Sequence, residues 1–133
     1  MRVRELMQKD VKTVNLDTAV NDAVVTLTDR HISALPVVDG MGRMVGVISS
    51  TDILTSEAEA QDTVEREALF EQMMVRDIMT PRPLTVSPEA DVREAAQQML
   101  YADIHRLFVT SGDRVIGVIS TTDIVRGVAM GHL

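Results

Sequence analysis

The sequence predicts an α/β protein of the α+β type, built from two tandem copies of one β-α-β-β-α unit. The segment Gly46–Leu54 recurs as Gly117–Val125, and the similarity continues around it for about 50 residues. Within each copy, the spacing of apolar residues alternates between the period of a strand and the period of a helix. We therefore infer a duplicated unit that folds twice.

The two copies stay in register along the chain. An offset of 72 relates Val3 to Val75, and the loss of one residue at a turn leaves an offset of 71 between Asp52 and Asp123. The predicted division is a first repeat at 1–54, a helical linker at 55–74, a second repeat at 75–126 and a tail at 127–133.

Each copy begins with a short extended piece, expected at Lys12–Leu16 and Leu84–Val86, that leads into an amphipathic helix. The helical period predicts one buried face, made of Val20, Ala23, Val24 and Leu27 in the first copy and of Val92, Ala95, Ala96, Met99 and Leu100 in the second. Ser87-Pro88-Glu89 predicts the start of the second of these helices, with Ser87 as its N-cap.

Two strands and a closing helix follow in each copy. The strands are expected at Leu35–Val38, Met44–Ser49, Leu107–Thr110 and Val115–Ser120, with a glycine-containing turn inside each pair. The closing helices begin near Thr51 and Thr122. Gly46 and Gly117 fall inside strands, which indicates either the close approach of a backbone or ligand or only room for packing.

The linker Thr55–Met74 is rich in Glu and Ala, and it reads as an extension of the first closing helix followed by a link into the second unit. An apolar stripe on it favours either core packing or a Met-rich subunit interface, and consists of Val64, Ala68, Leu69, Met73 and Met74.

Composition narrows the classes of function. The net charge is −7, and 20 acids outnumber 13 basic residues, which disfavours nucleic acid as a partner. Aromatic residues make up only 2% of the chain, so aliphatic side chains and Met must fill the core. The absence of cysteine excludes disulfides and fits a cytoplasmic protein, and no apolar run predicts a membrane span.

The tandem unit, with each copy ending in Gly-h-h-Ser-x-x-Asp-h-h (h, an apolar residue), resembles the cystathionine-β-synthase (CBS) domain pair, or Bateman module. The resemblance covers about residues 1–126 and leads us to expect a stand-alone module with no catalytic domain. It implies two repeats packed sheet to sheet about a pseudo-twofold axis, two clefts for adenine nucleotides or other adenosyl compounds, and a homodimer.

The segments Ser49–Asp52 and Ser120–Asp123, called the Asp52 box and the Asp123 box below, allow two interpretations. Each fits an N-capping box, in which the Ser caps a helix and the Asp reaches back from the third helical position. Each also fits a ribose site, in which the carboxylate accepts hydrogen bonds from the sugar hydroxyls. The two roles are compatible, because a helix N-terminus also points amides at an anion.

His105 and Arg106 stand where the first copy has Ser33 and Ala34. The pair resembles the phosphate contacts of adenylate-sensing CBS pairs, since Arg offers a bidentate fork and His a second donor. The alternative is a surface ion pair with an acid such as Asp103 or Asp113.

In the resembled family, each cleft combines the Asp of one repeat with the early strands of the other. Cleft A is then expected to use Ser49, Asp52, Thr85, Val86, Ile104, His105 and Arg106. Cleft B is expected to use Ser120, Asp123, Thr13, Val14, Ile32, Ser33 and Ala34. Cleft B lacks the cationic pair, so we expect cleft A to bind AMP or ADP more tightly.

The function expected from these features is that of a regulatory sensor of AMP, ADP or ATP that acts on a separate effector protein. The alternatives are a structural or interaction module with vestigial clefts, and a sensor of S-adenosylmethionine or NAD(H). No nucleophile–base pair supports an enzyme. The three histidines are dispersed and predict no metal site, with His31 expected at a helix end and His132 in a frayed tail.

Overall fold

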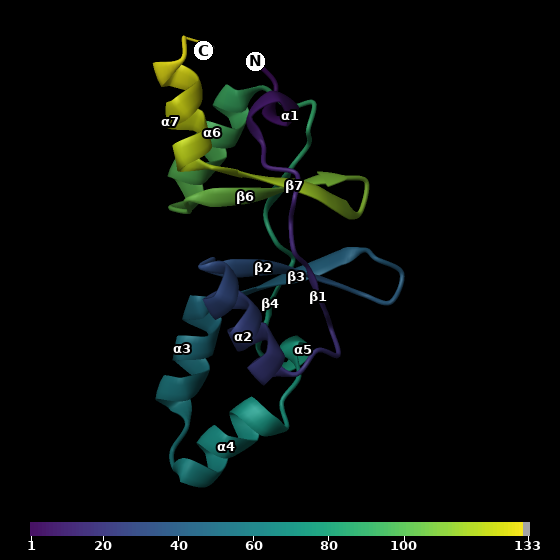
Figure 1. The fold of residues 1–133 in the computed structure, drawn as a ribbon, viewed down its shortest axis with the longest axis vertical. Helices are drawn as coiled ribbons and strands as arrows, with labels where there is room; N and C mark the ends of the chain where they lie inside the picture. Colours follow the sequence, from purple (N-terminus) through teal and green to yellow (C-terminus); the bar gives the residue numbers. More distant parts are fainter. Residues whose placement is uncertain (132–133) are drawn as a thin grey trace. The chain divides into compact units, whose positions relative to one another are not determined.

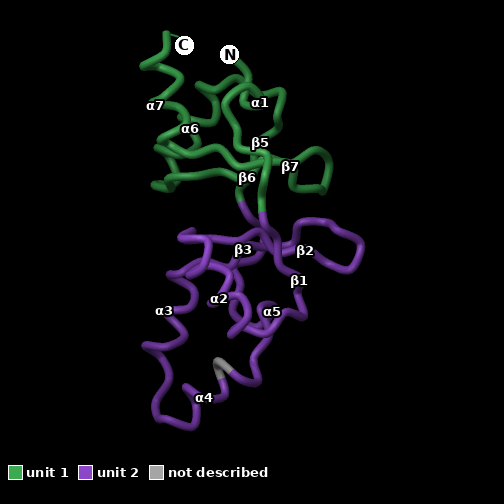
Figure 2. Tube along the Cα trace, in the orientation of Figure 1, with its two compact units in different colours: residues 1–11, 84–133 green, residues 12–83 purple. Residues whose placement is uncertain are grey.

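The computed structural model describes residues 1–131, apart from the side chains of residues 69 and 70; His132 lies outside the described residues. The chain forms two compact units (Figure 2). Unit 1 contains Met1–Val11 together with the chain from Leu84 onward, and unit 2 contains Lys12–Pro83. The chain therefore passes from unit 1 to unit 2 and back again.

Both units are mixtures of helices and strands, as the sequence predicts (Figure 1). Unit 2 holds β1 (Val14–Asn15), α2 (Val20–Arg30), β2 (Ala34–Val38), β3 (Met44–Ser49), α3 (Ser50–Glu59), α4 (Thr63–Glu71), α5 (Val75–Ile78) and β4 (Thr80–Pro81). Unit 1 holds α1 (Val3–Leu6), β5 (Thr85–Val86), α6 (Val92–Ala102), β6 (Arg106–Ser111), β7 (Arg114–Ser120) and α7 (Thr121–Ala129).

Each unit is built on one sheet with the same local topology. In unit 2 the strand order is β1-β2-β3-β4, with β1 parallel to β2 and the other neighbours antiparallel. In unit 1 the order is β5-β6-β7, again with a parallel pair followed by a hairpin. This repetition follows from the duplicated pattern of the sequence.

The core of each unit is aliphatic, in line with the scarcity of aromatic residues. The buried cluster of unit 2 consists of Val14, Ala23, Leu27, Leu35, Val37, Ile48 and Val75. The cluster of unit 1 consists of Val3, Val86, Ala95, Met99, Leu107, Val109 and Ile119. The predicted helix faces are thus buried at most positions, but Leu100 is 82% exposed, contrary to expectation.

The segments that begin each sequence repeat are exchanged between the units. We call Met1–Val11 leader 1 and Val75–Pro83 leader 2. Leader 1 docks on the second repeat, where Val3 N donates to Ala90 O at 2.9 Å. Leader 2 docks on the first repeat, where Val75 N donates to Thr18 O at 2.8 Å. Both leader valines are fully buried, so each leader contributes to the core of the other repeat.

Each leader also forms an ion pair with the repeat on which it docks. Arg4 of leader 1 pairs with Glu89 at 3.2 Å, and Arg76 of leader 2 pairs with Asp17. The two pairs are equivalent at the offset of 72 residues. Exposed ion pairs of this kind add little stability, but they follow the same register as the buried contacts.

The exchanged leaders explain the two strand glycines. A Cβ built on Gly117 would lie 2.8 Å from both Gln8 O and Met7 Sδ of leader 1. A Cβ on Gly46 would lie 2.8 Å from Thr80 O and 2.7 Å from Met79 Sδ of leader 2. Of the alternatives considered for Gly46 and Gly117, the structure therefore shows the close approach of another backbone.

One local prediction was wrong, and the extent of another is now defined. The second amphipathic helix does not begin at Ser87, because α6 is capped by Asp91, which accepts from Arg93 N at 2.8 Å. Ser87 instead closes a turn by accepting from Glu89 N. The extension of α3 stops at Glu59, since Asp62 caps a new helix by accepting from Glu65 N.

The apolar stripe predicted on the linker is partly open to solvent, since Ala68 and Met73 are half-buried whereas Val64 and Met74 are exposed. Val64 is 74% exposed and Met74 is 43% exposed, so core packing does not account for either side chain. The side chain of Leu69 lies outside the described residues.

We predict that Gly117→Ala lowers the free energy of unfolding by about 1–3 kcal/mol, because the new methyl group overlaps the backbone of leader 1. Urea denaturation followed by circular dichroism measures the change. Gly40→Ala is the matched control, since nothing lies within 4 Å of its added Cβ, and it is expected to stay within about 0.5 kcal/mol of the parent. Equal effects of the two substitutions contradict the prediction.

Candidate functional site

The two Asp boxes have the same geometry at the junction of a strand and a closing helix. Ser49 Oγ accepts from Asp52 N at 3.1 Å, and Asp52 Oδ2 accepts from Ser49 N at 2.9 Å. The equivalent distances between Ser120 and Asp123 are 3.2 and 2.8 Å. The capping interpretation is therefore confirmed in both repeats.

The cap uses only one oxygen of each carboxylate and leaves Oδ1 for another partner. Asp52 Oδ1 accepts from Thr80 Oγ1 at 2.9 Å, and Asp123 Oδ1 accepts from Gln8 Nε2 at 3.0 Å. Both partners come from the exchanged leaders, and they are equivalent at the offset of 72. Each Asp box is thus completed by the leader of the other repeat.

Thr80 and Gln8 were not among the residues predicted for the site, and neither was Arg126. The Arg126 guanidinium lies one helical turn beyond Asp123, with its Nη1 3.4 Å from Asp123 Oδ1. The spacing of Arg126 from the box was visible in the sequence as an i,i+3 pair on a helix. The leader residues carried no such local signal.

The second-strand residues predicted for the clefts lie beside the box of their own unit. In unit 2, Ser50 N donates to Ser33 O at 2.9 Å, and Ala34 pairs with Ser49 across the hairpin. In unit 1, Thr121 N donates to His105 O at 2.9 Å, and Arg106 pairs with Ser120. Ile32 and Ile104 precede these residues and pack against the two cores.

The first-strand residues are set deeper in each unit. Val14 and Val86 are buried, and they pair in parallel with Val37 and Val109. Thr13 and Thr85 are half-buried neighbours of these valines. In each repeat the second-strand residues therefore lie at the start of the middle strand, beside the Asp box, whereas the first-strand valines pair with residues further along that strand.

The grouping of clefts A and B across the repeats stays a prediction. It joins Asp52 of unit 2 to His105 and Arg106 of unit 1, and each unit is described by itself. Among the ion pairs of the described residues, none joins Arg106 to Asp103 or Asp113. The alternative of a surface ion pair is therefore not what the structure shows for Arg106.

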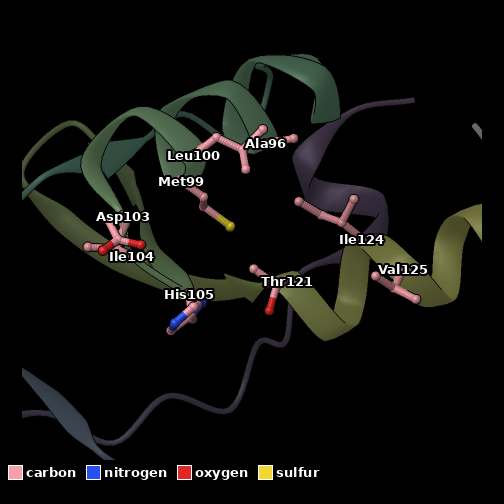
Figure 3. A pocket seen from close by; sticks show the side chains of 9 residues that line it. All are labelled: Ala96, Met99, Leu100, Asp103, Ile104, His105, Thr121, Ile124 and Val125. Carbon is pink, nitrogen blue, oxygen red and sulfur yellow. The ribbon is translucent and has the colours of Figure 1, made fainter.

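Unit 1 has a hollow next to Asp123 and another next to His105. One is a cavity of about 560 Å³ that borders Asp123 and is lined by Met1, Glu5, Leu6, Met7, Gln8, Asp123, Arg126 and Met130. The other is a groove of about 270 Å³ between α6 and α7 (Figure 3), lined by Ala96, Met99, Leu100, Asp103, Ile104, His105, Thr121, Ile124 and Val125. The groove is apolar along the helices, and His105 lies at its sheet end beside Thr121.

Both Asp boxes lie within segments that match a known domain family. The CBS domain family matches residues 3–59 and again residues 75–129. The chain belongs to the CBS domain family. Both matched segments start at a leader and run through the closing helix, so each family repeat contains one leader and one Asp box.

Solved structures of CBS pairs share the fold. The structure of CBSX2 in complex with AMP aligns with a TM-score of 0.83 and 28% identity, over 99% of this chain and 98% of that chain. The CBS domain pair of protein MJ0100 in complex with 5′-methylthioadenosine and S-adenosyl-L-methionine aligns with a TM-score of 0.81 and 25% identity, over 98% of each chain.

Related sequences differ in length. A CBS domain-containing protein of Dictyostelium discoideum is 32% identical over 130 residues, which cover 92% of this chain and 88% of that protein. Other relatives are longer, and this chain spans 23%, 59% and 41% of three of them. The enzymes among the relatives are matched over only 22% or 23% of their length.

Two features are absent from the described residues. Within them, no helix combines the length and the apolar character that crossing a membrane requires. The same residues contain no group of three or more His, Cys, Asp or Glu side chains arranged to hold a metal ion.

Proposed function

We propose that this CBS pair is a regulatory module that binds an adenine nucleotide, with AMP, ADP or ATP as the favoured ligands. The observation that carries the proposal is the pair of matching Asp boxes, each with a carboxylate at a helix N-terminus next to the start of a strand. Related pairs in complex with AMP and with S-adenosyl-L-methionine support an adenosyl ligand.

The proposed roles follow the two boxes. Asp52 and Asp123 accept hydrogen bonds from ribose hydroxyls, and the helix N-termini of α3 and α7 favour an anionic ligand. The residues proposed to line the adenine are Thr13, Val14, Ile32, Thr85, Val86 and Ile104. His105 and Arg106 are proposed to contact the phosphate, whereas Ser33 and Ala34 offer no charge at the equivalent place.

A ligand that binds one arrangement of the repeats better than another shifts the population toward it, by no more than its difference in affinity. We propose that this shift is read by a separate effector protein. The alternative is an interaction module with empty clefts. If AMP, ADP, ATP, NADH and S-adenosylmethionine at millimolar concentration all leave the melting temperature unchanged, the alternative holds.

We predict that Asp52→Asn weakens AMP binding about tenfold or more in calorimetry, because a charge-assisted hydrogen bond to the ribose is lost. Asp123→Asn is expected to cause a smaller loss. Asp77→Asn is the control, since Asp77 Oδ2 accepts from Met74 N at 2.9 Å in the same capping role but lies outside the Asp boxes. Equal losses from Asp52→Asn and Asp123→Asn contradict the expected inequality of the two sites.

The double substitution His105→Ala/Arg106→Ala is expected to weaken AMP binding about tenfold and to leave adenosine binding unchanged, because only AMP has a phosphate for the pair to hold. Arg93→Ala on α6 serves as the control for the loss of an exposed arginine. If Asp52 and the pair share one cleft, the effect disappears in the Asp52→Asn background. Its disappearance in the Asp123→Asn background instead would contradict the grouping of cleft A.

We also propose that the module forms a homodimer through the outer faces of its helices. In unit 1, Leu100, Val125 and Val128 are 82%, 65% and 61% exposed along α6 and α7. In unit 2, Leu54 stands at the position equivalent to Val125 and is 66% exposed. A second copy presents the same apolar positions, so a twofold contact between like faces buries them on both sides.

Replacement of Val125 by Glu is expected to shift the protein from dimer to monomer in sedimentation velocity, because it places a charge in the apolar contact. Leu84→Glu is the matched control, as Leu84 is 50% exposed but lies outside the helices. A monomeric parent protein, or a dimer that survives Val125→Glu, contradicts the proposed interface.

A further inference from the structure

The two Asp boxes differ in how many hydrogen bonds their carboxylates already accept. An ionised carboxylate has about four acceptor positions. Asp123 Oδ2 accepts from Ser120 N at 2.8 Å and from Ser120 Oγ at 2.9 Å. Asp123 Oδ1 accepts from Gln8 Nε2 at 3.0 Å and has Arg126 Nη1 at 3.4 Å. All the acceptor positions of Asp123 are therefore taken.

Asp52 keeps a position open. Its Oδ2 accepts from Ser49 N and Ser49 Oγ, at 2.9 and 3.0 Å, as in the other box. Among the described residues, its Oδ1 accepts from Thr80 Oγ1 alone, at 2.9 Å, because the residue equivalent to Arg126 is Thr55. One acceptor position remains for a hydroxyl of a ligand.

Burial of the two side chains agrees with this difference. Asp123 is only 5% exposed, whereas Asp52 is half-buried. Leader 1 supplies Met1, Glu5, Met7 and Gln8 to the wall of the cavity that borders Asp123. The leader therefore covers the carboxylate that a ribose would have to reach.

We propose that Gln8 of leader 1 acts as a latch on the Asp123 box and lowers the affinity of this box for its ligand. While the Gln8 amide and the Arg126 guanidinium both contact Asp123 Oδ1, no acceptor is left for a ribose hydroxyl, and the turning away of Gln8 frees one. The Asp52 box is the open site. This inference rests on the proposed function, since it assigns the two boxes unequal affinity for the same class of adenosyl ligand.

The latch can open without undocking the leader. The backbone of Gln8 is held by Val118, with Gln8 N donating to Val118 O at 2.8 Å and Val118 N donating to Gln8 O at 2.9 Å. The residue itself is exposed, so its side chain has solvent to turn into. The apparent affinity of the Asp123 box is then reduced by the fraction of molecules in which the latch is open.

The test isolates the Asp123 box in the Asp52→Asn background and measures adenosine and AMP binding by calorimetry. Adding Gln8→Ala is expected to tighten the binding of both ligands about threefold to tenfold, which corresponds to the loss of one competing hydrogen bond. Lys9→Ala, at the next leader position, is the control and is expected to change neither affinity. Thermal unfolding checks that the leader stays docked.

A reciprocal exchange tests the other box. In the Asp123→Asn background, Thr80→Gln is expected to weaken the binding of both ligands, because it installs the longer amide next to Asp52. Unchanged or weaker binding after Gln8→Ala overturns the latch, as does an effect confined to AMP, which would place the action of Gln8 at the phosphate. Absence of adenosyl binding by the unmodified protein overturns the proposed function itself.

Discussion

The close approach of each leader to a glycine in the other repeat is the contact on which the rest of the structure depends. Gly46 and Gly117 have no Cβ, so the leader backbone can lie against the last strand of each hairpin. That approach brings Val3 and Val75 into the two cores. A side chain at either glycine would push the leader outward and with it a fully buried valine. Both the packing of the cores and the exchange of the leaders therefore require glycine, with no Cβ, at these two positions.

The docking of the leaders also determines the hydrogen-bond partners of the two Asp boxes. Capping occupies one carboxylate oxygen and fixes its orientation at the start of the closing helix. The leader supplies the hydrogen-bond donor to the other oxygen, which is the Thr80 hydroxyl at Asp52 and the Gln8 amide at Asp123. In the proposed binding mode, capping and ligand binding use different oxygens of the carboxylate and therefore need not be alternatives. A duplicated motif can in this way acquire two unequal sites through changes outside the motif.

Much of the fold could be predicted from the sequence because its signals are local. The period of the apolar residues and the Ser-x-x-Asp spacing locate the helices, the hairpins and the caps of α3 and α7. The prediction of Ser87 as the N-cap of α6 was wrong because a Ser-Pro-Glu run also forms a turn. Asp91 caps the helix instead. Leu100 keeps the helical spacing yet is 82% exposed, because spacing alone does not mark where the buried face of a helix ends. The partners of the Asp boxes could not be predicted, since a hydrogen bond between Gln8 and Asp123 joins residues 115 positions apart.

The chain passes from unit 1 to unit 2 and back, so an isolated repeat would lack the leader that docks on it. A single repeat cut at its sequence boundaries would carry a leader with nothing to dock on and a glycine-bearing strand with an uncovered edge. Two such fragments could satisfy each other by trading leaders, which is the arrangement of a domain-swapped dimer. In its connectivity, this chain is such a dimer joined into one polypeptide by the linker helix α4 and its flanking turns. The linker then serves to keep the two halves of an exchange at high local concentration.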